Sequence, residues 1–279
     1  MADCQPNFLI IGAMRSGTTS LSHYLKSHPS IFLSAQKEIH YFDFNYDKGE
    51  GWYRQQFANA SGYPAVGEAT QTYMYDMEAT VRMAKLLPYA RLLVILRNPI
   101  ERTYSHYWHS HMRGKEKLSL RDALNDELYG ASRDTDKRIR YARSYLERSR
   151  YINQLLNVCQ YYSKDALHVL LLDDLKAQPS ETLRSVYRFL EIDDTVAVPQ
   201  ISKTINASVK FRSLKLRNML KKLPRRSILR RVGERLNTST FQYPPLDPDT
   251  RGWLCQYFAE DIDALEEWLG RDLRMWKAS

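Results

Sequence analysis

The sequence predicts an α/β fold with three layers, in which a mostly parallel central sheet carries helices on both faces. Short apolar runs typical of buried strands lie at residues 8–11 (FLII), 91–96 (RLLVIL) and 167–172 (LHVLLL). Between these runs, apolar residues recur at intervals of three and four positions, which is the spacing of a helix with one buried face. Strands that alternate with helices in this way form parallel sheets with both faces covered.

The helices follow from the same spacing. The first strand leads into a tight turn at 12–17, which glycines bound, and then into a helix at 18–26. Further helical patterns lie at residues 78–87, 145–162, 179–190 and 248–276, the last of which we expect to be a packed terminal helix.

The length and composition are those of one globular domain. Of the 279 residues, 43% are hydrophobic and 26% are charged, so the chain can bury a core and is not of a disordered or collagenous type. Because it contains no internal repeat and no Gly/Ser-rich linker, we expect residues 1–279 to form a single domain. The polar stretch 113–150 is predicted to be a loop and helix insertion over the surface.

The cysteines and the N-terminus bear on the compartment. Cys4, Cys159 and Cys255 are scattered and lack the spacing of a disulfide framework or a zinc site. The N-terminal segment has no basic leader, and no apolar run reaches the length of a membrane span. We therefore expect a soluble protein of the cytoplasm.

Positive charge is concentrated in residues 210–235. This segment holds eleven Lys or Arg and one acidic residue, a local charge of +10, whereas the chain carries +9, so the rest sums to 9 − 10 = −1. Its apolar residues fall mostly at helical spacing with Pro224 as a break, which predicts amphipathic helices with solvated basic faces. Such a segment can also meet phosphates, an acidic acceptor, a membrane surface or nucleic acid.

The turn after the first strand has the composition of an anion-binding loop. GAMRSGTTSL, residues 12–21, is similar to a phosphate-binding P-loop, but Thr18 replaces the lysine of that pattern and Arg15 supplies a cation three residues earlier. A loop between a parallel strand and its helix directs backbone N–H groups and the positive helix end to one point. The alternative is an ordinary turn that needs glycine. The residues expected to bind the anion are Arg15, Ser16, Gly17, Thr18, Thr19 and Ser20.

A second informative stretch, ILRNPIERTYSHYWH, spans residues 95–109. Arg97 follows the strand 91–96 directly, so it is expected at the carboxyl edge of the sheet, where ligands of open α/β folds bind. Ser105 lies eight residues later at the start of a helical run and can donate to the same anion. Alternatively, Arg97 caps a helix or pairs with Glu101.

Taken together, the two stretches resemble the sulfotransferase family that uses 3′-phosphoadenosine 5′-phosphosulfate (PAPS), in particular the branch of the heparan sulfate sulfotransferases and their bacterial relatives. GAMRSGTTSL resembles the 5′-phosphosulfate loop of that family, and LVILRNPIERTYSHYWH resembles its 3′-phosphate motif, with Arg97 and Ser105. The resemblance covers residues 7–276 and includes, in order, KEIHYFD (37–43), KGEGWYRQQF (48–57), VGEATQTYM (66–74), LLLDDLKAQPSETLRSVYRFLEI (170–192) and EEWLGRDLRMW (266–276). It implies a P-loop-like fold.

The resemblance also implies how transfer occurs. In the sulfuryl donor, charge develops on the oxygen between phosphorus and sulfur, and by analogy with phosphoryl transfer the protein chiefly positions groups and stabilises that charge. Arg15, the loop N–H groups and the hydroxyls of Thr18 and Thr19 can do this, so no metal is expected. The family match makes Glu38 the general base, with His40 close by to orient the acceptor or tune the carboxylate.

The residues alone favour a different interpretation, in which Glu38 is a solvated loop charge and His40 is a core histidine. If residues 37–43 are locally extended, Glu38 and His40 point to the same side, because side chains alternate along an extended chain.

Two positions depart from the family pattern. Ala69, Thr70 and Gln71 stand where heparan-type enzymes carry a Lys-Thr-Pro sequence, so the role of that lysine is not carried over. The Lys-Gly pair of the late cofactor loop is missing from INASVKFRS (205–213), which leaves Lys210 and Arg212 as candidates for contacting the 3′-phosphate or the adenine.

We therefore expect a sulfotransferase that acts on a hydroxyl of a carbohydrate, a glycolipid or a small metabolite. We expect no nucleic-acid partner and no transmembrane segment. Acceptor selection is expected in 113–150 and in the basic segment 210–235, and peripheral membrane contact is expected through 210–235. One alternative is an ATP-dependent kinase with a degenerate P-loop and a magnesium pair at Asp173 and Asp174. The other is a nucleic-acid or anionic-membrane binding module that uses residues 210–235.

Overall fold

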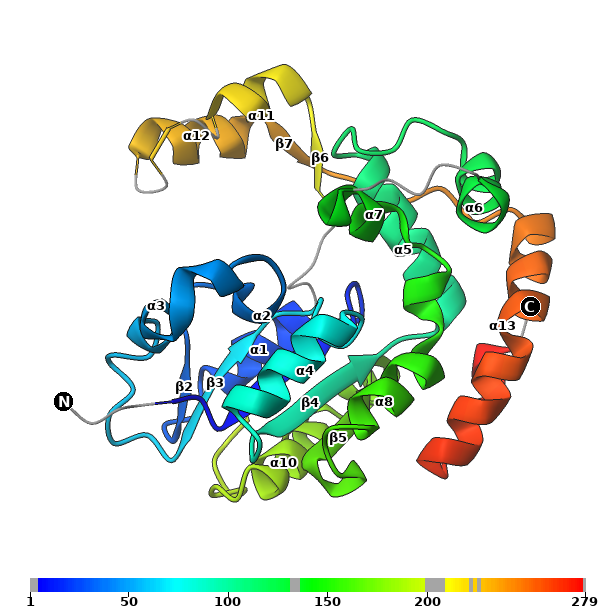
Figure 1. Ribbon diagram of the computed structural model, residues 1–279. Helices are drawn as coiled ribbons and strands as arrows, with labels where there is room; N and C mark the ends of the chain where they lie inside the picture. The colour runs from blue at the N-terminus through cyan, green and yellow to red at the C-terminus, as the bar shows by residue number, and fades with distance from the viewer. Residues whose placement is uncertain (1–4, 131–135, 199–208, 221–222, 225–226, 278–279) are drawn as a thin grey trace. The chain divides into compact units, whose positions relative to one another are not determined.

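The computed structural model describes residues 5–130, 136–198, 209–220, 223–224 and 227–277. The chain groups into two compact units (Figure 1). The first spans Met1–Asn98, Arg150–Lys203 and Ala264–Arg271, and the second spans Pro99–Ser149, Thr204–Asp263 and Asp272–Ser279. A single domain over residues 1–279 stays a prediction.

A parallel sheet of five strands forms the centre of the first unit. Its strands are β1 (Phe8–Gly12), β2 (Ile31–Leu33), β3 (Ala65–Ala69), β4 (Arg91–Leu96) and β5 (Leu167–Leu171), in the order β2-β3-β1-β4-β5. All four neighbouring pairs are parallel. The strands predicted from apolar runs are confirmed as β1, β4 and β5. The short β2 and β3 (AVGEA) were not predicted, because neither forms a long apolar run.

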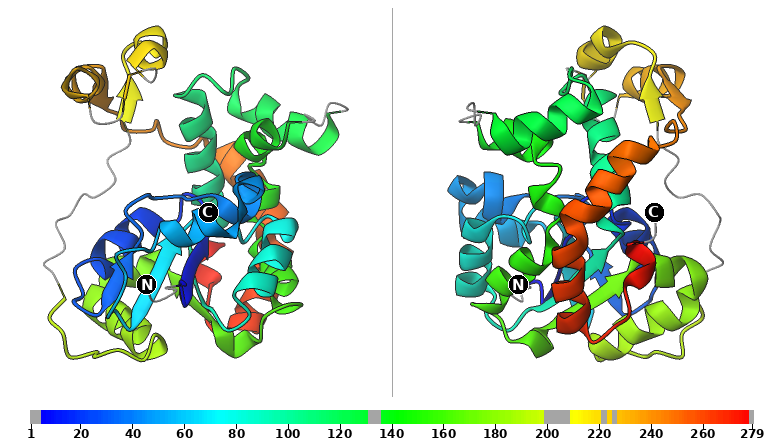
Figure 2. Two further views of the ribbon diagram at one scale, coloured as in Figure 1. Left: turned by 60° about the vertical axis from the view of Figure 1, so that its left-hand side comes forward. Right: turned by 90° about the vertical axis from the view of Figure 1, so that its right-hand side faces the viewer.

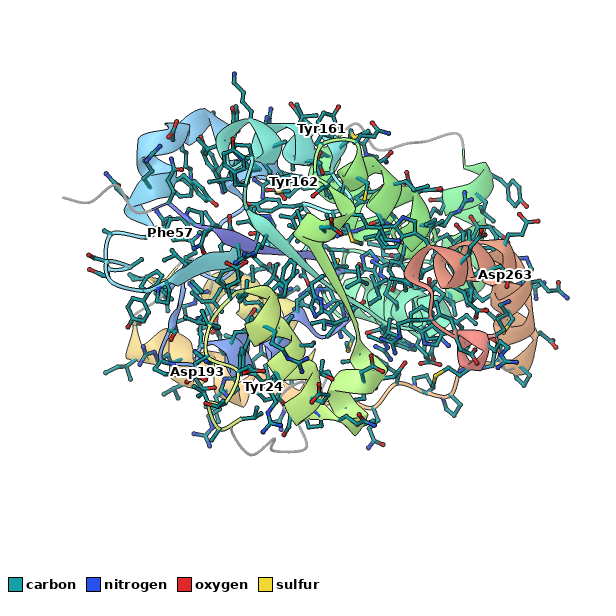
Figure 3. All side chains as sticks on the ribbon, turned by 90° about the horizontal axis from the view of Figure 1, so that it is seen from below. Tyr24, Phe57, Tyr161, Tyr162, Asp193 and Asp263 are labelled. Carbon is teal, nitrogen blue, oxygen red and sulfur yellow. The ribbon has the colours of Figure 1, made fainter. Side chains whose placement is uncertain are left out.

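Helices cover both faces of this sheet, which confirms the predicted fold class. The four largest that lie wholly in the first unit are α1 (Thr18–Leu25), α4 (Met77–Leu86), α8 (Tyr151–Cys159) and α10 (Pro179–Phe189). Figure 3 shows Tyr24 of α1 and Asp193 beyond α10 on one side of the sheet, with Tyr161 and Tyr162 after α8 on the other. Every residue of β1 and β3 is buried as a result.

Smaller elements complete the first unit. They are α2 (Tyr41–Phe44), α3 (Gly49–Gln55), α9 (Leu172–Ala177) and the 3₁₀ turns η1 (Tyr46–Lys48) and η3 (Lys164–Ala166). The predicted continuous helix over 145–162 is wrong, because α8 begins only at Tyr151, after the 3₁₀ turn η2 (Glu147–Ser149).

Backbone hydrogen bonds fix the loops at the carboxyl ends of β1 and β3. The Ala13 N–H donates to the Ile95 carbonyl (2.9 Å), the Thr70 N–H to that of Ile10 (3.0 Å) and the Met74 N–H to that of Ile11 (3.0 Å). Because β1 lies between β3 and β4, the loops that follow all three strands meet at one sheet edge.

The second unit is mostly helical. It contains α5 (Pro99–His111), α6 (Leu120–Tyr129), α7 (Lys137–Arg143), α11 (Leu214–Leu220), α12 (Ile228–Leu236), most of α13 (Pro248–Leu269) and the turn η4 (Arg274–Trp276). Strands β6 (Val209–Phe211) and β7 (Thr238–Thr240) pair in antiparallel fashion. Figure 2 shows α11 and α12 as a helical pair beyond these strands. The predicted terminal helix and the helices of the basic segment are confirmed, whereas β6 was not predicted.

A buried arginine organises part of this unit. Arg102 is fully buried and donates to the Tyr145 carbonyl (2.8 Å) and to Ser149 Oγ (3.0 Å). The Glu127 carboxylate accepts the N–H groups of Tyr145 and Leu146, and burial raises the pKa of Glu127 to about 7 despite these bonds. These contacts anchor the segment that precedes α8.

Cys159 and Cys255 are free thiols, and Cys4 lies outside the described residues. None of the described helices is both long and apolar enough to cross a membrane.

Candidate active site

The loop between β1 and α1 is shaped by two residues with left-handed backbone. Arg15 has φ 70° and Gly17 has φ 100°. A Cβ on Gly17 would lie 2.7 Å from Cδ1 of Leu172, so a side chain at this position would displace the end of Leu172. The loop therefore depends on glycine for both conformation and space.

Ser16 is the clearest sign of a ligand in this loop. Its side chain is fully buried, and its Oγ has no hydrogen-bond partner among the described residues. A buried hydroxyl is normally paired, because leaving it unpaired costs free energy. An unpaired hydroxyl at the start of a helix, beside Arg15, suits an anion that would accept its hydrogen bond.

A second cation joins this loop from residues 37–43. Lys37 Nζ donates to Thr19 Oγ1 and lies 3.9 Å from Glu38 Oε1. Burial lowers the pKa of Lys37, and the charge of Arg15 lowers it further, against the opposing effect of Glu38. Arg15 and Lys37 are thus close enough to interact electrostatically, and Lys37 lies beside Glu38.

A glutamine connects the loop with Glu38. Gln71 Nε2 donates to Glu38 Oε1 (2.8 Å), and Gln71 Oε1 accepts from Thr18 Oγ1 (3.2 Å). Thr18 is the first residue of α1, whereas Glu38 and Gln71 lie in the loops that follow β2 and β3. The predicted anion loop and the predicted base are therefore coupled through a residue that had no predicted role.

His40 lies between two carboxylates. Its Nε2 is 3.7 Å from Glu38 Oε2, and its Nδ1 is 2.9 Å from Oδ2 of Asp43, whose side chain is fully buried. Thr72 Oγ1 also donates to Asp43. Burial by itself would lower the pKa of His40, but the bonds and charges of Asp43 and Glu38 prevail and raise it to about 9. His40 is therefore a cation at neutral pH.

Residues 38–40 do not have an extended backbone, so the condition under which Glu38 and His40 would point to the same side is not met. Glu38 and His40 both have φ 55°, in the left-handed region. The Glu38 N–H donates to the Ala69 carbonyl (3.1 Å), the His40 N–H to Thr70 Oγ1 (3.4 Å) and the Tyr41 N–H to Tyr73 Oη (2.9 Å). These bonds to the end of β3 hold a conformation that isolated non-glycine residues seldom adopt.

A buried carboxyl in β3 stabilises the loop that carries Glu38. Glu68 in β3 is fully buried and accepts from Thr70 Oγ1 (2.7 Å), Tyr53 Oη (2.9 Å) and Tyr73 Oη (3.1 Å). Burial raises the pKa of Glu68 to about 7 against these hydrogen bonds. Thr70 and Tyr73 therefore join Glu68 to the backbone of the loop that carries Glu38.

The other predicted binding residues lie in different parts of the fold. Ser20 lies in α1, and Arg97 follows β4 in the first unit, where its carbonyl accepts from Tyr151 Oη (2.9 Å). Ser105 is buried in α5, Lys210 lies in β6 and Arg212 is exposed, all in the second unit. Their part in binding a 3′-phosphate or adenine stays a prediction.

Two acidic residues that the alternative interpretations assigned to other partners form ion pairs with arginines. These arginines lie in α13 and in the segment after it. Glu101, the suggested partner of Arg97, accepts from Arg251 Nη2 (2.6 Å). Asp174, half of the suggested magnesium pair, accepts two hydrogen bonds from Arg271 (2.7 and 3.0 Å). Among the described residues, His, Cys, Asp and Glu do not form a group of three that could hold a metal ion.

Sequence reasoning missed Lys37, Gln71, Thr72 and Asp43. The spacing of His40 and Asp43, three positions apart at the start of a helix, was a readable signal. Gln71 had none, because its contacts span 33 and 53 positions of the chain.

Residues 5–238 match the family model of the sulfotransferase domain. The chain belongs to the sulfotransferase family. It is therefore an enzyme of this class, and the kinase alternative is not retained. A sulfotransferase from Alicyclobacillus acidocaldarius has a similar structure, with a TM-score of 0.74 and 25% identity over 99% of this chain and 100% of that one.

Curated relatives extend well beyond the matched region. The human bifunctional heparan sulfate N-deacetylase/N-sulfotransferase 3 is 25% identical over 98% of this sulfotransferase and 31% of its own length. The membrane-associated sulfotransferase kil1 of Dictyostelium discoideum is 40% identical over 107 residues, 37% of this chain and 23% of that protein. A mouse sulfotransferase complexed with PAP shares the fold, with a TM-score of 0.50 and 16% identity over 94% of this chain and 86% of that one.

Proposed function

We propose that this sulfotransferase moves the sulfuryl group of PAPS to a hydroxyl of a carbohydrate, a glycolipid or a small metabolite, with Glu38 as the general base. The observation that carries the proposal is the hydrogen-bonded path from Thr18 through Gln71 to Glu38. It holds a carboxylate beside a loop whose buried Ser16 hydroxyl lacks a partner among the described residues.

The loop after β1 serves the donor in this proposal. The backbone N–H groups at the start of α1 and the Ser16 hydroxyl bind the 5′-phosphate, and Arg15 with Thr18 and Thr19 stabilises the charge that develops on the bridging oxygen. Arg97 and Ser105 are assigned to the 3′-phosphate, with Lys210 and Arg212 near that phosphate or the adenine. The mouse structure named as a complex with PAP supports a donor of this type in the fold.

Glu38 serves the acceptor. Its carboxylate takes the proton of the attacking hydroxyl while the S–O bond to the acceptor forms and the S–O bond to the 5′-phosphate breaks. The leaving nucleotide, 3′-phosphoadenosine 5′-phosphate (PAP), retains the bridging oxygen and its charge. His40, a cation 3.7 Å from Glu38, orients the carboxylate and the acceptor oxygen. Relatives named for heparan sulfate support a carbohydrate acceptor, although their names specify N-sulfation.

Binding and transfer test the proposal separately. Calorimetry with PAP should show binding to the wild type and to Glu38→Gln, and weaker binding to Arg15→Ala. Radiolabelled PAPS with a panel of desulfated glycans, glycolipids and a cell extract should give a labelled product with the wild type and only a small residual amount with either variant. Glu50→Gln, in an exposed pair with Arg54, is the matched control and should keep both properties. Absence of PAP binding to the wild type would overturn the proposal.

A further inference from the structure

Helix α12 presents an apolar face to solvent. Ile228, Leu229, Val232 and Leu236 are 76%, 75%, 51% and 68% exposed. At about 100° per residue, these four positions fall within an arc of about 100° on one side of the helix. Exposed apolar side chains are ordinary when scattered, but a continuous stripe on one helix indicates a binding surface.

Basic residues border this stripe. Arg231 and Arg235 are exposed and follow its edge on the helix, while Arg230 lies on the far side in an ion pair with Glu234 (2.8 Å). Residues 210–235 carry eleven Lys or Arg and one acid. An acidic surface that accepts apolar side chains is therefore the complementary partner.

The stripe is not the packing face between α11 and α12. Leu220 of α11 is buried against Gly233, where a Cβ would lie 2.7 Å from Leu220 Cδ2. Asn237 and Ser213 exchange two hydrogen bonds of 2.8 Å at the base of the pair. The two helices therefore pack against each other through other residues, and the side chains of the stripe stay exposed.

We propose that α12 lies in the headgroup region of a bilayer that contains anionic lipids, with its apolar stripe inserted and the flanking arginines at the lipid phosphates. A narrow apolar face bordered by arginines is the composition of a helix that lies in a membrane interface. The negative potential of such a surface attracts the charge of residues 210–235. This inference does not depend on the proposed function.

Sedimentation of the full chain with vesicles tests it. Vesicles of phosphatidylcholine with about 30% phosphatidylserine should bind the wild type at least about tenfold more strongly than phosphatidylcholine alone, and about 0.5 M NaCl should weaken that binding. The double variant Ile228→Ser/Leu229→Ser should bind at least about tenfold more weakly. The control Tyr89→Ser removes a side chain that is 94% exposed on the first unit and should bind within about twofold of wild type.

Three results would overturn the proposal. They are equal binding to the two vesicle types, unchanged binding by the double variant, and a wild type that does not bind vesicles but loses self-association in the double variant. Melting temperature and PAP affinity, which the double variant should leave unchanged, exclude misfolding as the cause of lost binding.

A second inference rests on the proposed function and on a different observation, the position of Gln71. Its amide donates to Glu38 and accepts from Thr18 at the same time, as a neutral amide can and a lysine or a carboxylate cannot. We infer that Gln71 is a positioning residue that sets the Glu38 carboxylate relative to the donor loop. It is not a catalytic residue, because it acts through Glu38.

Gln71→Leu tests this role, since leucine has a similar size and neither hydrogen bond. Transfer from PAPS, or hydrolysis of PAPS to PAP and sulfate if an acceptor is lacking, should slow about 10- to 100-fold in kcat, because small displacements of a reacting group carry large rate penalties. PAP affinity and melting temperature should stay within about threefold and about 3 °C of wild type. Gln56→Leu, which removes a half-buried glutamine bonded to the Trp52 carbonyl (3.0 Å), is the control.

A double-mutant cycle with Glu38→Gln tests whether Gln71 acts through Glu38 or independently of it. If Gln71 acts through Glu38, adding Gln71→Leu to Glu38→Gln should change the residual rate by less than about threefold. Full additivity, or a Gln71→Leu enzyme with wild-type kcat, would overturn this inference. Failure of the wild type to bind PAP would instead overturn the proposed function.

Discussion

The charge on His40 is open to a direct test through its buried partner. Asp43→Asn keeps the shape of the side chain and removes the carboxylate that lies 2.9 Å from His40 Nδ1. Burial would then be opposed only by Glu38, and the pKa of His40 should fall from about 9 toward its ordinary 6.5. The difference between these two values corresponds to about 3 kcal/mol in favour of the imidazolium, at about 1.4 kcal/mol per pH unit.

The raised pKa of His40 determines how the free energy of unfolding changes with pH. Because folded His40 holds its proton more tightly than unfolded His40, its contribution to the free energy of unfolding is fully present below pH 6.5. It is lost as the pH rises through about 9. In Asp43→Asn this loss between pH 6.5 and 9 should largely disappear, and the variant should be less stable than wild type at about pH 6.

Proton NMR titration of the His40 ring measures its pKa. Urea unfolding at about pH 6 and about pH 9.5 measures how the free energy of unfolding changes with pH. His168 is an internal reference, because it lies beside Ser185 and its pKa should be the same in wild type and variant. Burial lowers the pKa of His168 in both. Asp47→Asn, which removes an exposed carboxylate four residues after Asp43, is the control for loss of a carboxylate. A His40 pKa that stayed near 9 in Asp43→Asn would refute the assignment of Asp43 as the group that holds the proton.

Three further outcomes are expected. Ser16→Ala should weaken PAP binding about tenfold without lowering the melting temperature, because the lost hydroxyl bonds only the ligand; a drop in stability would count against this. Gly17→Ala should destabilise the fold by about 2 kcal/mol or more in urea titration, since it adds strain at φ 100° and a clash with Leu172; wild-type stability would contradict the loop geometry. Burial raises the pKa of Glu68 to about 7, so the free energy of unfolding should decline between pH 4.5 and 7, and Glu68→Gln should remove that decline; an identical profile would show that Glu68 does not titrate there.

The parts of the fold that could be predicted from the sequence are those with a local signal. β1, β4 and β5 are continuous apolar runs, and the helices between them keep their spacing. β3 lacks that signal because Gly67 and Glu68 interrupt it, and the buried Glu68 is acceptable only because Thr70, Tyr53 and Tyr73 donate to it. That compensation comes from residues outside the strand.

The same reasoning explains what was missed in the site. Arg15 to Thr19 and Glu38 were accessible through motifs, whereas Gln71 acquires its contacts only because β3 lies between β2 and β1. The left-handed backbone at Glu38 and His40 could not be predicted from the local sequence either. It is held by hydrogen bonds to Ala69 and Thr70, which lie about 30 positions further along the chain.

The strand order β2-β3-β1 divides the chemistry among separate stretches of chain. In the proposed function, residues after β1 bind the donor and residues after β2 supply the base, so substitutions can accumulate in either stretch while the other keeps its role. Gln71, after β3, has no such independence, because its amide contacts both Thr18 and Glu38. Diversification of acceptor choice, in nature or in the laboratory, is therefore expected to spare Gln71 and to proceed around it.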